Sequence, residues 1–415
     1  MLMTRRRASI AAAALVGFAA ACSTDSSITS LKAPGAASEN QSEGRGVFQR
    51  YTAIGTSVSM GVQSDGVNAA TQATSWPAQL AALGGRTLSQ PLIALPGCPA
   101  PIAAPLLAGI RISGEPTLGN PAALSCAPLL PGVHLPVDNV AINGALASDA
   151  LLTTPELTPN PVYDRVLQPG HTQVSTMIEN NPKLVSVELG VNEILGARTG
   201  VAIPGGTLVL VPVWQHSYDL VLDAVQRTTK MAVLVGLPDD VRNFPGLRSG
   251  NELWNDRNEL FVAANVVVSP DCNGSANMLF VPIKVGVAVV AGLQARALGQ
   301  PAVALSCAAG GPTDQDLTLT PAEVAIVNAQ AAAMNAHIQA EAAARGFAYF
   351  SLGALYDLPG LKAPFSVVAT FQGPQPFGPY VSLDGVHPSA AGSGILAAAA
   401  AHALNVAYNL GIPED

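Results

Sequence analysis

The chain has 415 residues, of which 49% are hydrophobic and only 12% charged, so it can build one large domain or two smaller ones around a sizeable core. The net charge of −8, without a basic patch, argues against nucleic acid as a partner.

The first residues are typical of an export signal. Three arginines at positions 5–7 precede a short apolar stretch that ends at Ala21 and is too short for a stable membrane span. Cys22 follows directly, which resembles the start of a bacterial lipoprotein. We therefore expect residues 1–21 to be removed as a signal peptide and Cys22 to carry a lipid that anchors the exported protein in the cell envelope; ordinary cleavage after Ala21 is the alternative. Residues 22–46 are small and polar, and they predict a flexible tether.

Residues 47–54 alternate and are rich in β-formers, which predicts a first strand. The strand ends at Gly55, Thr56 and Ser57. Ligands of open α/β sheets bind outside the carboxyl ends of the strands, so Ser57 would present its hydroxyl group at such a site. The alternative is that Thr56 and Ser57 only form a turn or a helix N-cap.

A helix is predicted between Ser75 and Gly84, and an insertion follows it at about residues 86–137. Ten prolines lie between residues 91 and 136, which excludes a regular helix or a central strand there. The insertion either walls a substrate pocket or only covers the fold.

The remaining cysteines are Cys98, Cys126, Cys272 and Cys307. In an exported chain an even number of cysteines indicates disulfides, and we favour the local pairs Cys98–Cys126 and Cys272–Cys307. The spacings do not resemble a zinc site.

The middle of the chain alternates strands and helices, with strands at residues 138–142, 184–189 and 231–236 and helices at 172–180 and 218–228. The second of these strands leads into Gly190, Val191 and Asn192. An amide side chain at a strand end can donate a hydrogen bond to a developing oxyanion, although an asparagine in a turn is common. Asp239 and Asp240 follow the third strand; they would contact substrate or a metal, or simply form a polar turn.

Residues 241–315 form a second insertion, in which the apolar stretch 278–293 predicts either a buried helix or a lid over an acyl pocket. Thr320, Pro321 and Glu323 then form a capping box that begins a helix running to Arg345. The remaining predicted elements are a last strand at 347–352, a loop at 353–381 and a terminal helix at 389–410. Within that loop, Phe371, Phe377 and Tyr380 either line the pocket mouth or pack the loop itself.

The loop continues into Asp384-Gly385-Val386-His387, which precedes the terminal helix. A serine hydroxyl is a poor nucleophile at neutral pH unless a base takes its proton and a carboxylate orients that base. Asp384 and His387 could supply both from one loop. An acidic turn with an incidental histidine is the alternative.

These alternating elements predict an α/β fold, a three-layer α/β/α sandwich with a mainly parallel sheet and with Pro-rich and apolar insertions, over residues 47–415.

Four short blocks resemble the SGNH/GDSL hydrolase family in their order: Gly55-Thr56-Ser57, Gly144, Gly190-Val191-Asn192 and Asp384-Gly385-Val386-His387. The family usually has Gly-Asp-Ser-Leu in its first block and Gly-x-Asn-Asp in its third; here Thr56, Val58 and Glu193 replace three of those residues. The resemblance implies an ester hydrolase with Ser57 as nucleophile, His387 as base and Asp384 orienting it. It also implies an oxyanion hole from Ser57, Gly144 and Asn192. An α/β-hydrolase elbow would need Gly-x-Ser-x-Gly, and Ser59 stands where its last glycine belongs.

The sequence therefore predicts a serine esterase that uses neither a metal nor an organic cofactor. Its partner would be a small-molecule or lipid ester, hydrolysed in the manner of a lipase or a short-chain esterase. A carbohydrate O-deacetylase and a catalytically inactive ligand-binding surface lipoprotein stay open as alternatives.

Overall fold

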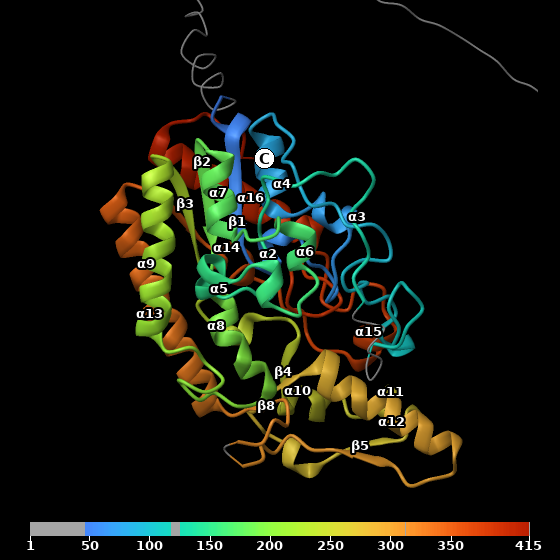
Figure 1. The fold of residues 1–415 in the computed structure, drawn as a ribbon. Helices are drawn as coiled ribbons and strands as arrows, with labels where there is room; N and C mark the ends of the chain where they lie inside the picture. The colour runs from blue at the N-terminus through green and yellow to red at the C-terminus, as the bar shows by residue number, and fades with distance from the viewer. Residues whose placement is uncertain (1–45, 118–124, 312, 415) are drawn as a thin grey trace, which may run out of the picture.

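The structure is a computed structural model, and it describes residues 46–117, 125–311 and 313–414. The predicted signal peptide, Cys22 and nearly all of the predicted tether lie outside the described residues. The predicted α/β/α sandwich is confirmed: a parallel sheet lies between two layers of helices (Figure 1).

The central sheet has the strand order β1-β2-β3-β9, and every neighbouring pair is parallel. Its strands are β1 (Tyr51–Gly55), β2 (Leu184–Glu188), β3 (Met231–Gly236) and β9 (Ala348–Ser351). Gly55 lies opposite Glu188 in the register of β1 and β2. Because parallel strands all end at the same edge, the residues that follow β1 and β2 are brought together there.

Side chains of a strand point alternately to its two faces, and the buried residues of β3 divide accordingly. Ala232 and Leu234 pack in one apolar cluster with residues of α9 and α13, while Val233 and Val235 pack in a second cluster with residues of α4 and α16. The helices of the first face are α5 (Ala147–Leu152), α7 (Gln173–Asn180), α9 (Val211–Thr228) and α13 (Pro321–Arg345). Those of the second are α4 (Trp76–Leu83), α14 (Gly353–Tyr356) and α16 (Ala390–Tyr408).

Helix α16 is the one helix of the described residues that is long and apolar enough to cross a membrane by length and composition. Its residues Leu396, Ala400 and Leu404 are buried in the second cluster together with Trp76 and Phe350. Burial against the sheet therefore accounts for the apolar residues on one side of α16.

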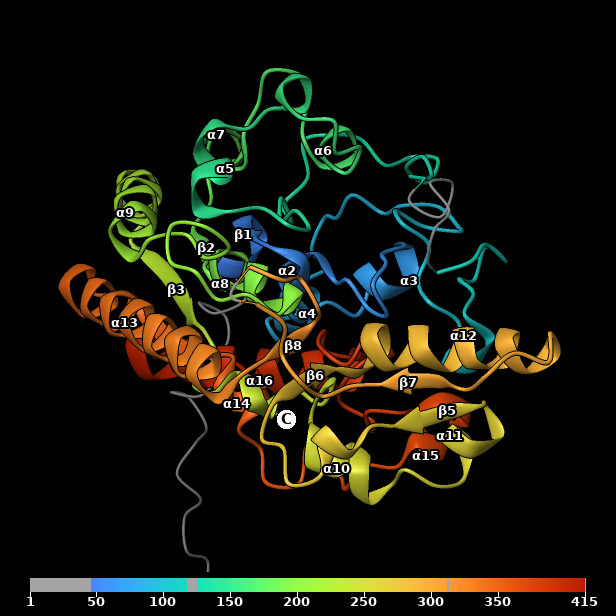
Figure 2. The same cartoon turned by 90° about the horizontal axis from the view of Figure 1, so that it is seen from below.

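The second insertion has an apolar core of its own, to which Leu253, Phe261, Leu279 and Val289 contribute together with Phe371 from the C-terminal loop. Figure 1 shows this part, in yellow and orange, beyond the end of the sheet where α2 (Ser57–Met60) begins, and Figure 2 shows it from below. Its helices are α10 (Gly250–Asn255), α11 (Leu260–Ala263) and α12 (Gly286–Ala297), with α15 (Val367–Gln372) from the C-terminal loop. Its strands are the antiparallel β4 (Leu247–Ser249), β6 (Met278–Phe280) and β8 (Thr318–Leu319), and the parallel pair β5 (Val266–Val268) and β7 (Val303–Leu305).

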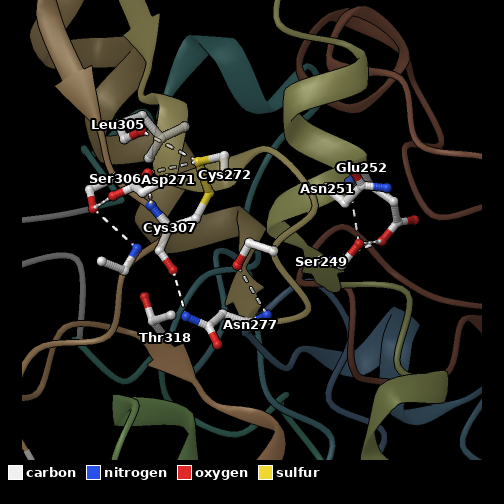
Figure 3. Close-up of a disulfide and its surroundings, with 12 residues drawn as sticks. Ser249, Asn251, Glu252, Asp271, Cys272, Asn277, Leu305, Ser306, Cys307 and Thr318 are labelled. Carbon is white, nitrogen blue, oxygen red and sulfur yellow. Dashed lines mark hydrogen bonds between the residues drawn. A yellow bond between two sulfur atoms is a disulfide. The ribbon is translucent and has the colours of Figure 1, made fainter.

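The two disulfides are Cys98–Cys126 in the first insertion and Cys272–Cys307 in the second. These are the local pairs that the sequence favours. Figure 3 shows the second bridge, where the backbone N–H of Cys307 donates to Asp271 and the Asn277 side chain donates to the Cys307 carbonyl group.

Short elements complete the chain. The short α-helices are α2 (Ser57–Met60), α3 (Ala69–Gln72), α6 (Tyr163–Val166) and α8 (Val191–Leu195). The 3-10 turns are Phe48–Arg50, Leu106–Ala108, Pro155–Leu157, Gly196–Thr199, Val241–Asn243 and Pro270–Cys272, and Val281–Val285 is a π-helical turn before α12.

The prediction of a strand at residues 138–142 is wrong, because this segment does not form a regular β-strand. The segment does run parallel to β1, with the N–H of Val140 donating to Ala53 and that of Ile142 donating to Gly55. However, the Asn139 side chain accepts from the N–H of Ala141, and such local bonds compete with a sheet ladder. Only an isolated bridge forms, between Ala53 and Asn139.

The observed starts of two other elements, β1 and α9, differ from the predicted ones. The first strand begins at Tyr51 and not at 47, because Phe48–Arg50 form a 3-10 turn. Helix α9 begins at Val211, seven residues before the predicted start, with proline in its first turn. The capping box of Thr320 and Glu323 is confirmed by reciprocal hydrogen bonds.

Candidate active site

Ser57 is the first residue of the short helix α2, directly after β1 and Thr56. The first N–H groups of a helix have no partner inside the helix, so the backbone N–H of Ser57 is free of the α2 hydrogen-bond pattern. The side chain is nearly buried but its hydroxyl group has a partner: Ser57 Oγ lies 2.9 Å from Nε2 of His387.

His387 and Asp384 come from the loop before α16. Nδ1 of His387 lies 2.9 Å from Oδ2 of Asp384, and the other carboxylate oxygen accepts from the backbone N–H groups of Val386 and His387 at 2.8 Å. The structure thus brings the three residues Ser57, His387 and Asp384 together in one continuous hydrogen-bonded row.

The charges of this pair stabilise each other. Burial alone would raise the pKa of Asp384, but the His387 charge and the hydrogen bonds to the carboxylate hold that pKa below its usual value. Burial alone would lower the pKa of His387, but the Asp384 charge, with further contributions from Asp65 and Glu188, holds it above its usual value. The imidazole can therefore accept a proton readily, which is the property required of a general base.

The Asp384 loop docks backbone to backbone on the second insertion. Gly385 has φ +73°, and the N–H of Gly246 donates to its carbonyl group at 2.8 Å. A β-carbon on Gly385 would lie 2.5 Å from the Cα of Gly246, closer than real contacts allow.

We expect Gly385→Ala to lower kcat by about 10²-fold, since moving the loop displaces His387 from Ser57 and small misplacements of reacting groups have effects of this size. Gly360→Ala is the matched control, because Gly360 has a similar φ of +79° but open space where the β-carbon would go. Both variants carry the same backbone strain. Equal steady-state activity of the two variants would contradict a role for the Gly246–Gly385 contact.

The predicted oxyanion residues lie on two neighbouring segments. Asn192 is in α8 after β2, and its side-chain amide donates to the carbonyl group of Ala145 at 2.8 Å, next to Gly144. The segment that leads to Gly144 is held beside Ser57, because Ile142 donates to Gly55. An amide NH₂ group has two N–H donors, so the bond to Ala145 leaves one of them.

A cavity of about 200 Å³ begins at His387 and Asp384. Its walls are overwhelmingly apolar and come from both insertions, from α8 and from the C-terminal loop. The apolar lining includes Ile102, Leu106, Leu107, Val191, Ile194, Val241, Phe244, Leu247, Phe280, Pro282, Ile283, Val289, Val290, Leu319 and Phe371. The apolar stretch 278–293 thus contributes both to the core of the insertion and to the cavity wall.

Of the aromatic residues in the C-terminal loop, only Phe371 lines the cavity; Phe377 is buried in the cluster around α16, and Tyr380 is outside the cavity lining. Asp239 and Asp240 form a polar turn: Asn335 donates to Asp239, and Arg242 pairs with Asp240.

Two residues beside the candidate triad, Asp65 and Arg111, carry no sequence signal that would find them. The backbone N–H of Asp65 donates to Asp384 at 2.6 Å, and the carboxylate of Asp65 pairs with the buried Arg111 of the first insertion at 2.7 Å. Arg111 also donates to the carbonyl groups of Asp65 and Ala100. A lone aspartate in a turn and a lone arginine in a Pro-rich segment are ordinary surface residues by pattern, so only the tertiary structure connects them with His387.

Two groups of side chains in the described residues have a geometry that could hold a metal ion. In the first, Cys272 and Cys307 are already joined as a disulfide. The second is Asp219, His337 and Glu341 on α9 and α13, where His337 pairs with Asp219 at 2.7 Å. Neither group lines the cavity beside His387.

No protein-family model matches the chain, and no curated protein matches it either. Among solved structures, the chain is similar to an extracellular lipase from Streptomyces rimosus, with 15% sequence identity and a TM-score of 0.32. The alignment covers 84% of this chain and 98% of the lipase. So distant a likeness says nothing about the reaction, and the function has to be argued from the site itself.

Proposed function

We propose that this protein is an exported serine hydrolase that cleaves carboxylic esters with apolar acyl groups. The observation that carries the proposal is the row of hydrogen bonds from Ser57 through His387 to Asp384, two residues of which, His387 and Asp384, line an apolar cavity. A nucleophile, a base and a residue that orients the base are the parts that acyl transfer requires.

In the proposed reaction, Ser57 Oγ attacks the ester carbonyl carbon while its proton passes to Nε2 of His387. The N–H groups of Ser57 and Gly144 and the Asn192 amide would stabilise the oxyanion. His387 then protonates the departing alcohol, which leaves an acyl group on Ser57. A water molecule, deprotonated by His387, releases the acid and restores the hydroxyl group.

The cavity favours an apolar acyl chain over a sugar. Sugar recognition needs several polar groups aimed at hydroxyls, whereas the walls here are mainly aliphatic and aromatic. We expect kcat/KM for p-nitrophenyl esters to rise from acetate to octanoate. Activity on acetylated sugars alone would instead favour a carbohydrate O-deacetylase.

Filling the cavity should shift this preference. Gly286 lies in a right-handed helical conformation at the start of α12, and a β-carbon there would lie 3.6 Å from Phe371, in ordinary contact. We expect Gly286→Leu to lower the ratio of octanoate to butyrate kcat/KM by about 10-fold or more, because single methylene groups in apolar pockets have effects of this size.

Gly286→Ala, which adds only a methyl group, is the control and should change that ratio much less. An unchanged ratio in Gly286→Leu would show that the acyl chain binds elsewhere.

The proposal includes the cellular location. Two disulfides are typical of proteins that fold in an oxidising compartment outside the cytoplasm. A lipid on Cys22 would hold the enzyme at the membrane surface. Metabolic labelling with a fatty acid tests this, and a Cys22→Ser chain that keeps the label would contradict it.

A further inference from the structure

A buried carboxylate holds the turn that carries Ser57. Glu188 is the last residue of β2 and is only 1% exposed. Its carboxylate accepts hydrogen bonds from the backbone N–H of Thr56 at 3.0 Å and from that of Ser59 at 3.2 Å. It also accepts from the hydroxyl groups of Thr56 at 2.8 Å and Ser59 at 3.0 Å. The four donors thus come from the residue before Ser57 and from the residue two positions after it.

Neighbouring residues, Trp76 and Gly55, support the contact between Glu188 and Ser59. The indole N–H of Trp76 donates to Ser59 Oγ at 3.0 Å, which leaves the hydroxyl proton of Ser59 to point at Glu188. The contact between Ser59 and Glu188 needs a glycine at position 55, because a β-carbon there would lie 2.6 Å from Ser59 Oγ and 3.1 Å from Glu188 Oε2. Because Glu188 lies opposite Gly55 in the sheet, its position is fixed by the register of two buried strands.

We propose that Glu188 is a positioning residue that fixes the Ser57 hydroxyl group and the Ser57 N–H in their reactive geometry; the inference rests on the proposed function. Burial raises the pKa of Glu188 above its usual value, and the hydrogen bonds from Thr56 and Ser59 oppose that rise because they favour the charged form. Above that pKa the carboxylate is ionised, and hydrogen bonds to an ionised acceptor are about twice as strong as those between neutral groups. Four of them clamp the backbone on both sides of the nucleophile to the rigid sheet.

Glu188 also acts on His387 through its charge. The acidic groups whose charges raise the pKa of His387 are Asp384, Asp65 and Glu188, and Arg111 is paired with Asp65. The charge of Glu188 also contributes to raising the pKa values of Tyr356 and Glu193. A negative group on the nucleophile side of the imidazole stabilises the imidazolium that forms when Ser57 loses its proton.

Glu188→Gln tests the proposal. Glutamine has the shape of glutamate but no charge, and its NH₂ group replaces one carboxylate oxygen. That NH₂ group would face the N–H and O–H donors of Thr56 and Ser59, which need an acceptor. We expect kcat for p-nitrophenyl octanoate to fall by about 10²-fold with little change in KM. The rate at which a fluorophosphonate labels Ser57 should fall in parallel. The acidic limb of the kcat/KM profile should move to lower pH, because removing a negative charge lowers the pKa of His387.

Glu252→Gln is the matched control. Glu252 likewise accepts from the backbone N–H and the hydroxyl group of a serine, but that serine is Ser249, at the start of α10, and not a residue of the turn around Ser57. Thr56→Val provides a milder second variant if Glu188→Gln fails to fold. It removes one hydroxyl donor to Glu188, and we expect kcat to fall by about 10-fold, the effect of one lost interaction in the transition state.

The outcomes separate the two proposals. If the fluorophosphonate labels the wild type, Glu188→Gln and Thr56→Val at the same rate, the positioning role is overturned and the proposed function stands. A loss of thermal stability in these variants with unchanged kcat and pH profile also overturns the positioning role. A wild-type chain that neither hydrolyses esters nor takes the label overturns the proposed function and the positioning role with it.

Discussion

Ser57→Ala is expected to lower kcat for p-nitrophenyl octanoate by about 10⁶-fold, because removing the nucleophile of a hydrogen-bonded catalytic unit removes the contribution of the whole unit. His387→Ala should cause a loss of similar size, and the double variant should lose little more than either single one. This lack of additivity is the signature of residues that act together, since Oγ of Ser57 and Nε2 of His387 share one hydrogen bond.

Ser217→Ala is the control for the Ser57 variant. Ser217 lies on α9, is half-buried, and its hydroxyl group donates to a carbonyl group of its own helix. Its removal should leave the rate unchanged. Wild-type activity in Ser57→Ala would contradict the site assignment, whatever the activity of the control.

Asp384→Asn is expected to lower kcat by about 10⁴-fold, because an amide in place of the carboxylate favours the wrong tautomer of His387. The pH profile should change as well. His387 acts as a base only when neutral, and the Asp384 charge holds its pKa above the usual value for histidine, so the acidic limb of wild-type kcat/KM should have its midpoint above that usual value. Without the negative charge of Asp384, the remaining activity should have its midpoint at lower pH.

Asp219→Asn is the matched control, because Asp219 also pairs with a histidine, through Nε2 of His337 at 2.7 Å, but lies outside the cavity lining. We expect neither its kcat nor its pH profile to change. An Asp384→Asn variant with the wild-type midpoint would show that Asp384 does not set the pKa of His387.

The overall architecture could be predicted because local and long-range signals agree. Strands β2 and β3 are short apolar runs rich in valine, and helix α13 begins with a capping box and ends at Gly346. The segment 138–142 shows the limit of this reasoning. Its sequence has strand composition, but the Asn139 side chain bonds to its own backbone and to Ser59, which no pattern of residues reveals.

Part of the candidate site could be predicted because its residues stand at positions that can be recognised in the sequence. Ser57, Asn192, Asp384 and His387 stand at chain positions where a strand or loop ends, and such positions can be recognised along the chain. Glu188 also ends a strand, but its role could not be predicted because its hydrogen-bond partners are residues 129 and 132 positions away. Contacts of this kind depend on the register of β1 and β2, which only the folded sheet determines.

Ser57 should react as an activated nucleophile. Incubation of the folded protein with a fluorophosphonate, followed by peptide mass spectrometry, would locate the modified residue. We expect a single adduct, on Ser57, that is not formed by the His387→Ala variant. An adduct on another serine, or an unmodified wild-type chain that remains folded, would contradict this expectation.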